Sequence, residues 1–154
     1  MVEQFFYGFF DIKFPDGFHE LETVFHPVQI FDHLEFRRSG TEIQLSCSDP
    51  SLPCDKTNLV YRAARLFLER ARITEGVTVR LEKKIPMAAG LGGGSGNAAQ
   101  TLLGLNELFG HPLEIKTITE LAASIGSDVP FFLQDGPALG SGRGEMITPL
   151  NCLR

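Results

Sequence analysis

The chain has 154 residues, with 14 Lys and Arg against 19 Asp and Glu, which gives a formal net charge of −5. Hydrophobic residues make up 43% of it, enough for the core of one globular domain and too much for a disordered chain. The acidic balance argues against a nucleic-acid partner, and no apolar run approaches the roughly 20 residues that cross a bilayer. We therefore expect neither a nucleic-acid partner nor a membrane association.

The three cysteines, Cys47, Cys54 and Cys152, are odd in number and lack the spacing of metal ligands. Free thiols are typical of a reducing compartment, because disulfides form mainly in secreted chains. The sequence also opens without the basic-then-apolar segment of a secretory signal. These features predict a cytoplasmic protein without a metal centre built from its own side chains.

Apolar periodicity and turn residues predict strands and helices in groups, a pattern that favours an α+β fold over a doubly wound sheet. In chain order we predict a buried aromatic strand at 5–10, a turn at 15–17, an irregular strand-like segment at 21–37, a strand at 43–47, a helix at 58–72, a strand at 77–82, helices at 95–109 and 117–126, and a hairpin at 137–150. Thr117 and Glu120 fit a capping box at the start of the third helix, and Gly110 and Gly126 fit helix ends.

A glycine-rich loop at residues 86–99 joins the strand at 77–82 to the second helix. Five of the seven residues from 90 to 96 are glycine, which is too costly in conformational entropy for a simple connection. Backbone N–H groups in such a loop can converge on a ligand, and the following helix adds the positive end of its dipole. The loop therefore predicts a phosphate site, with a flexible turn or tight helix packing as the structural alternative.

Two other phosphate-binding motifs fit this loop poorly. A Walker loop requires a Lys directly after its glycines, and none is present. The dinucleotide-binding pattern is matched loosely by residues 94–99, but it requires a second parallel strand after the helix. Here the second helix leads through residues 111–114 into another predicted helix instead.

Four separated segments of the chain resemble a known family. Residues 86–99 resemble the phosphate-binding motif of the superfamily that includes galactokinase, homoserine kinase, mevalonate kinase and phosphomevalonate kinase. Residues 15–20 (Pro-Asp-Gly-Phe-His-Glu), 58–64 (Asn-Leu-Val-Tyr-Arg-Ala-Ala) and 126–132 (Gly-Ser-Asp-Val-Pro-Phe-Phe), taken with the triple glycine, resemble 4-diphosphocytidyl-2-C-methyl-D-erythritol kinases. The likeness extends from about residue 15 to 150, in the same order.

The resemblance implies the fold of a kinase N-terminal, ATP-binding domain at residues 1–150. This fold is like the second domain of ribosomal protein S5, with a mainly antiparallel sheet and helices on one face. It implies ATP-dependent phosphorylation of the 2-hydroxyl of 4-diphosphocytidyl-2-C-methyl-D-erythritol in non-mevalonate isoprenoid biosynthesis, with ATP and Mg²⁺ as cofactors. The family's C-terminal domain is expected to be absent from this chain, so a separate piece could complement it.

Residue by residue, the resemblance implies a catalytic Asp128, which would take the proton from the substrate hydroxyl. A carboxylate at the edge of the apolar residues 129–132 is a stronger base, although by residue type alone Asp128 fits a helix cap equally well. Phe18 and His19 match the end that holds the cytidine. Asn58 matches a position near adenine, or else caps the first helix. The predicted ATP-binding loop comprises Pro86, Met87, Ala88, Ala89, Gly90, Leu91, Gly92, Gly93, Gly94, Ser95, Gly96 and Asn97.

Some side chains within and beside the loop have two possible roles. Ser95 would offer its hydroxyl to phosphate or Mg²⁺, or act as the N-cap of the second helix. Lys83 and Lys84 could offset phosphate charge, although charges at a strand end are usually solvated.

The sequence departs from the family at several positions. Glu3 stands where the family has its catalytic lysine, and Phe5 falls at the position of an Asn. An acid in place of a base beside a triphosphate reverses the local electrostatics. Gly96 replaces a second serine, and Ala88 replaces a glycine. These departures leave an alternative function, a catalytically inactive nucleotide-binding remnant of the kinase.

Overall fold

The computed structural model describes residues 3–8, 12–13, 19–20, 23–28, 30–87, 89–134, 136, 138–141 and 146–149. The elements in chain order are β1 (Glu3–Gly8), β2 (Ile12–Lys13), β3 (His19–Glu20), β4 (Thr23–Val28), β5 (His33–Arg38), β6 (Ile43–Cys47), α1 (Leu59–Ala71), β7 (Val77–Glu82), α2 (Gly93–Leu108), α3 (Ile115–Ile125), the 3-10 helix η1 (Val129–Leu133), β8 (Ala138–Ser141) and β9 (Met146–Pro149). The predicted α+β class is confirmed.

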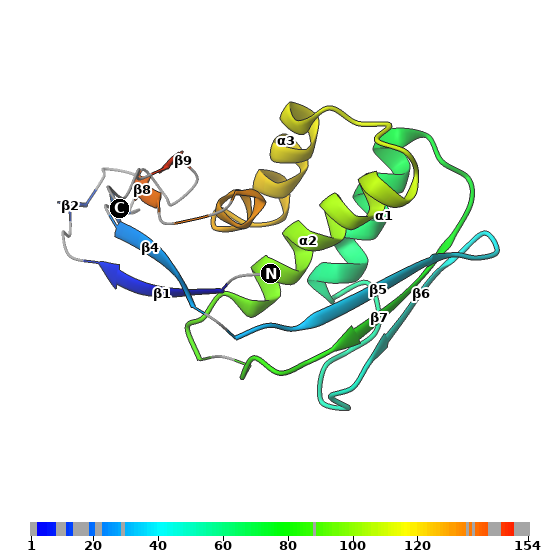
Figure 1. Cartoon of the computed structure of the whole chain (residues 1–154), viewed down its shortest axis with the longest axis horizontal. Coiled ribbons are helices and arrows are strands. Elements are labelled where there is room, and N and C mark those ends of the chain that lie inside the picture. The colour runs from blue at the N-terminus through cyan, green and yellow to red at the C-terminus, as the bar shows by residue number, and fades with distance from the viewer. Residues whose placement is uncertain are drawn as a thin grey trace.

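The helices lie on one face of a three-stranded sheet ordered β5-β7-β6 (Figure 1). Strand β5 runs antiparallel to the central β7, whereas β6 runs parallel to it, so this sheet is mixed. Alternation along β7 buries Val77, Val79 and Leu81 completely or nearly so, while Arg80 and Glu82 are exposed on the other face. The period of two therefore gives the sheet one apolar face, which the helices cover.

A second, four-stranded antiparallel sheet has the order β1-β4-β8-β9. Pairing of β8 with β9 confirms the hairpin predicted at 137–150. The irregular segment predicted at 21–37 is two strands, β4 and β5, that belong to different sheets. The short strands β2 and β3 form a separate pair. The turn predicted at 15–17 lies outside the described residues.

The core lies between the three-stranded sheet and the helices. Helix α1 buries one apolar stripe, with Val60, Ala63, Ala64 and Phe67 at 0–1% exposure. Helix α2 is central, because it packs against α1, β5, α3 and η1 (Figure 1). Phe131 and Phe132 at η1 are buried and stack edge to face, which confirms that they belong to the core. Within the described part of the chain, no helix is both long and apolar enough to span a membrane.

Two predicted helix starts are wrong. Helix α2 begins at Gly93 rather than at Ser95, because the Gly96 N–H already bonds to the Gly92 carbonyl at 2.8 Å. Helix α3 begins at Ile115 rather than at Thr117. Its N-cap is Glu114, whose side chain makes no capping bond, and Thr117 lies inside the first turn, so the predicted capping box does not form. In both cases backbone hydrogen bonds begin the helix two residues before the residue whose side chain is typical of an N-cap.

Candidate functional site

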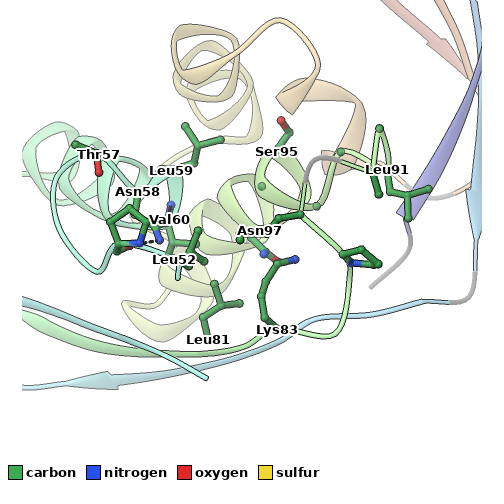
Figure 2. Close-up of a pocket in the computed structure, with 18 residues that line it drawn as sticks. Leu52, Thr57, Asn58, Leu59, Val60, Leu81, Lys83, Leu91, Ser95 and Asn97 are labelled. Atoms are coloured by element: carbon green, nitrogen blue, oxygen red, sulfur yellow. Dashed lines mark hydrogen bonds between the residues drawn. The ribbon is translucent and has the colours of Figure 1, made fainter. Parts of the chain in front are cut away.

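A pocket of about 360 Å³ lies where the N-termini of α1 and α2 meet the end of β7 (Figure 2). That volume is within the range of sites that hold a small organic ligand. Its lining joins the glycine-rich loop to α1 and to the loop before it, which are distant in sequence. The lining residues are Leu52, Pro53, Thr57, Asn58, Leu59, Val60, Leu81, Lys83, Pro86, Met87, Ala89, Gly90, Leu91, Gly92, Gly93, Gly94, Ser95 and Asn97.

Asn58 closes the N-terminus of α1. Its Oδ1 accepts the Val60 N–H at 2.9 Å, and its Nδ2 donates to the Pro53 carbonyl at 2.7 Å. The residue is 6% exposed and has extended backbone angles, as an N-cap residue does. Asn58 is therefore both the cap of α1 and a wall of the pocket, so the two readings of this residue are compatible.

The N-terminus of α2 is open. Gly92 occupies the N-cap position, and no side chain caps this end. The first N–H groups of a helix have no partner within it, so those of Gly93, Gly94 and Ser95 are available beside the pocket. Because the helix dipole adds a partial positive charge here, the arrangement suits an anionic group such as phosphate.

Both the backbone conformation at position 92 and the neighbouring side chain require a glycine there. Its φ of +67° lies in the left-handed region, and a Cβ at this position would lie 2.6 Å from Cζ of Phe132. Gly90 also has a positive φ, of +72°, but a Cβ there would meet nothing within 4 Å. The loop thus packs tightly against η1 at Gly92 and faces open space at Gly90.

A buried carboxylate, Asp32, bonds to two of the residues that line the pocket, Lys83 and Asn97. Its Oδ1 accepts the N–H groups of Lys84 at 2.6 Å and Ile85 at 2.9 Å. Its Oδ2 accepts the Lys83 ammonium at 2.5 Å and the Asn97 amide at 2.7 Å. Asp32 therefore ties the start of β5 and the end of β7 to the first turns of α2.

Charge in this cluster is balanced inside the protein. The Lys83 and Asp32 side chains are 6% and 0% exposed, so the prediction of a solvated Lys83 is wrong, whereas Lys84 is exposed beside Glu82. Burial by itself would raise the pKa of Asp32, but the hydrogen bonds from Ile85, Lys83, Lys84 and Asn97 outweigh it and lower that pKa. Asp32 is thus held as a carboxylate, and the Lys83 stem lines the pocket beside Asn97 (Figure 2).

Asp128 is at the N-cap position of η1, where its side chain makes no capping bond. It is partly exposed and is not among the described residues that line the pocket. Its connection with the glycine loop runs through η1, because Phe132 of that helix packs on Gly92. The structure therefore places Asp128 on the element next to the loop rather than within the pocket.

Of the other predicted residues, Ser95 lines the pocket but lies in the first turn of α2, so its predicted role as N-cap is wrong. Gly96 is buried in α2 and does not line the pocket. Phe18 and Ala88 lie outside the described residues, and His19 is described only as part of β3. Among the described residues, no cluster of three or more His, Cys, Asp or Glu is placed to bind a metal.

Sequence reasoning missed the role of Asp32, which no local pattern marks. Its partners Lys83 and Asn97 are 51 and 65 positions away in the chain. It also missed Leu52, Pro53 and Thr57, which the loop before α1 contributes to the pocket.

Comparison with known proteins agrees with this geometry. Residues 58–136 match the family model described as GHMP kinases N terminal domain. The chain is 47% identical over 137 residues to 4-diphosphocytidyl-2-C-methyl-D-erythritol kinase of Acaryochloris marina, a match that covers 88% of this chain and 44% of that protein. The same-named protein of Syntrophus aciditrophicus is 45% identical over 135 residues, covering 88% and 48%. The chain spans about half the length of these curated relatives.

Solved structures of kinases also superpose on this chain. A crystal structure of 4-(cytidine 5'-diphospho)-2C-methyl-D-erythritol kinase superposes with a TM-score of 0.82 at 39% identity, covering 97% of this chain and 53% of that one. Homoserine kinase from Cytophaga hutchinsonii superposes with a TM-score of 0.71 at 21% identity, covering 82% and 45%. The second likeness concerns the fold alone.

Proposed function

Because this chain belongs to the GHMP kinases, we propose that it is the ATP-binding N-terminal half of a 4-diphosphocytidyl-2-C-methyl-D-erythritol kinase. The whole enzyme would transfer the terminal phosphoryl group of ATP to the 2-hydroxyl of its substrate, in the cytoplasm, as a step of isoprenoid precursor synthesis. A C-terminal domain would complete the substrate cleft.

The observation that carries this proposal is the open N-terminus of α2 at the pocket. Three successive residues, Gly93, Gly94 and Ser95, line the pocket at the end of the helix that no side chain caps. Phosphoryl transfer requires mainly that the phosphates be held and their charge offset, which converging N–H groups supply. The apolar residues Leu52 and Leu81, which also line the pocket, suit the flat face of a nucleobase.

In this proposal the remaining roles are those that the family resemblance implies. Asp128 takes the proton of the attacking hydroxyl, and Phe18 with His19 holds the cytosine of the substrate. Ser95, which lines the pocket, is the residue of the described loop whose hydroxyl can contact a nucleotide-bound Mg²⁺. The metal would offset charge on the phosphates when bound.

A second candidate, a nucleotide-binding domain without catalytic activity, is favoured by one observation. Glu3, at the start of β1, stands where the family resemblance implies a catalytic lysine. A carboxylate there would repel the phosphates that a lysine attracts. This candidate keeps nucleotide binding and loses phosphoryl transfer.

Titration of the chain with a non-hydrolysable ATP analogue and Mg²⁺, followed by calorimetry, tests nucleotide binding. We expect saturable binding that falls at least about tenfold in Ser95→Asp, because the added charge at the open helix end repels phosphate. Ser95→Asn is the matched neutral control and should retain most of the affinity. An acid near a helix N-terminus does not destabilise the helix, so loss of binding cannot be attributed to unfolding. Equal affinities for the two variants would contradict the site.

Release of ADP in the presence of the cytidyl substrate separates the two candidates. Turnover that Asp128→Asn abolishes without loss of nucleotide affinity would support the kinase and the assigned base. The assay includes the C-terminal half of a related kinase, added to complete the substrate cleft. Binding without turnover in that mixture would support the inactive candidate, and Glu3→Lys then tests whether the acid is the cause. An active Asp128→Asn variant would remove the base assignment.

A further inference from the structure

Asp32 bonds to the chain on both sides of the glycine-rich segment 86–96. Before the segment, its Oδ1 accepts the N–H groups of Lys84 at 2.6 Å and Ile85 at 2.9 Å. After the segment, its Oδ2 accepts the side-chain amide of Asn97 at 2.7 Å. One carboxylate therefore joins the two ends of the segment, most of whose residues line the pocket.

The orientation of the Asn97 side chain depends on this carboxylate. Asn97 is 2% exposed, and its Oδ1 has no hydrogen-bond partner among the described residues. The Thr101 hydroxyl donates to the Asn97 carbonyl at 2.7 Å, but that contact lies within α2 and leaves the side chain free to turn. In the described part of the chain, the bond to Asp32 is thus the one that connects the Asn97 amide to the end of β7.

The segment between these contacts has little of its own to hold it in one conformation. Five of the seven residues from 90 to 96 are glycine, which loses more backbone freedom on ordering than any other residue. A Cβ at Gly90 would meet nothing within 4 Å, so neighbouring side chains do not fix the segment at that point. Fixing its two ends therefore lowers the entropy that remains to be lost when its N–H groups bind a ligand.

We propose that Asp32 is a positioning residue of the phosphate site. By holding both ends of segment 86–96, it keeps the N–H groups at the start of α2 aligned for the phosphates of a nucleotide. Asp32 acts through the segment, because it is 2% exposed and is not one of the described residues that line the pocket. This inference rests on the proposed function and deepens it, since it concerns the same site.

Charge and positioning predict opposite results for Asp32→Asn. If charge alone mattered, the change would strengthen phosphate binding, because it removes a negative charge and leaves the Lys83 ammonium unpaired at the pocket. Positioning predicts weaker binding. A carboxylate accepts hydrogen bonds through both oxygens, whereas an amide has one acceptor oxygen and an NH2 group that only donates. Asn at position 32 can therefore hold one end of the segment but not both.

Calorimetric titration of the Asp32→Asn chain with a non-hydrolysable ATP analogue and Mg²⁺ tests the proposal. We expect the Kd of the analogue to rise at least about tenfold, because the segment must then be ordered by the ligand. Titration with adenosine, which has no phosphates, is followed by NMR and should give a Kd within about twofold of that of the unmodified chain. A general loss of structure would weaken both ligands alike, so the ratio of the two constants is the decisive readout.

Two further variants separate positioning from stability. Thr101→Val removes a buried hydroxyl that also bonds to Asn97, but it keeps the bond to Asp32, so the ratio should not change. Asn97→Ala removes only the bond after the segment and leaves the pair of Asp32 and Lys83 intact. Alanine favours a helix, so this variant decides if Asp32→Asn fails to fold. Its expected rise in the Kd of the analogue is about threefold, with little change for adenosine.

An unchanged or lower Kd of the analogue in Asp32→Asn would overturn the proposal, and so would a parallel rise for both ligands. If the unmodified chain binds no nucleotide, the proposed function itself fails. NMR order parameters of the backbone at residues 90–94 then decide whether Asp32 holds the segment. They should fall in Asp32→Asn and stay unchanged in Thr101→Val, and equal values in all three chains would contradict the positioning role.

Discussion

The two helices that open onto the pocket end in opposite ways. At α1, Asn58 supplies a side-chain cap and a second bond to Pro53, so the first turn is satisfied by the protein itself. At α2, Gly92 supplies no side chain, and the first N–H groups are left for a ligand. The comparison shows how a fold can place one structural and one ligand-binding helix end beside a single pocket.

An open helix end needs support from elsewhere. Asp32 provides it from behind, by holding Asn97 in the second turn of α2, while Phe132 packs on Gly92 from the side. The capped end of α1 is supported locally, within the six residues from Pro53 to Asn58. Substitutions at these residues should therefore lower the free energy of unfolding by different amounts at the two helix ends.

The largest effect is expected from Asp32→Ala. The change leaves the Lys83 ammonium buried without its partner and removes the bond to Asn97, which should lower the free energy of unfolding by about 3–5 kcal/mol. Urea unfolding followed by circular dichroism measures it. Glu82→Gln, which breaks the exposed pair with Lys84, is the matched control and should change stability by less than about 0.5 kcal/mol. Similar losses in both variants would show that Asp32 does not anchor α2.

Gly92→Ala is expected to have the next largest effect. It combines a left-handed backbone with a contact at 2.6 Å to the Phe132 ring, so the loss of stability should be about 2–4 kcal/mol. Gly90→Ala has a similar φ and open space around it, and should cost about 1–2 kcal/mol. The difference between the two melting curves isolates the packing on η1. No difference would mean that Phe132 can move aside freely.

Asn58→Ala should lower the free energy of unfolding by about 1–2 kcal/mol, since the α1 cap is lost. Asn58→Asp keeps an oxygen that can accept the Val60 N–H but loses the amide that donates to Pro53, so its loss should be smaller. Hydrogen exchange at the Val60 amide is the readout. Faster exchange in Asn58→Ala than in Asn58→Asp is expected, and equal exchange would count against the cap.

The smallest effect is the acid dependence contributed by Asp32. Its pKa in the folded chain is below the ordinary 3.8, so the carboxylate contributes stability that is fully present above that value. This contribution is lost as the pH falls through the lower, folded pKa. The urea concentration at the unfolding midpoint should therefore decrease more steeply with falling pH, below pH 4, in the unmodified chain than in Asp32→Asn. Parallel curves would indicate that Asp32 titrates normally.

Local patterns in the sequence were sufficient for much of the fold. Apolar periodicity predicted α1, which buries Val60, Ala63, Ala64 and Phe67, and alternation predicted β7, because periodicity depends only on which side each residue faces. The exact start of α2 could not be predicted in this way. Ser95 looks like a cap in sequence, but the packing of Gly92 on Phe132 and the backbone bond from Gly96 set the start at Gly93.

The sequence by itself determined the helices, most of the strands and the glycine-rich loop, since each depends on residues close together in the chain. Only the tertiary structure decided that Asn58 and the loop share one pocket and that Asp32 neutralises Lys83. Both relations join segments about 30 to 50 positions apart. Local propensity is silent on such contacts, because they arise when distant elements pack together and exclude water between them.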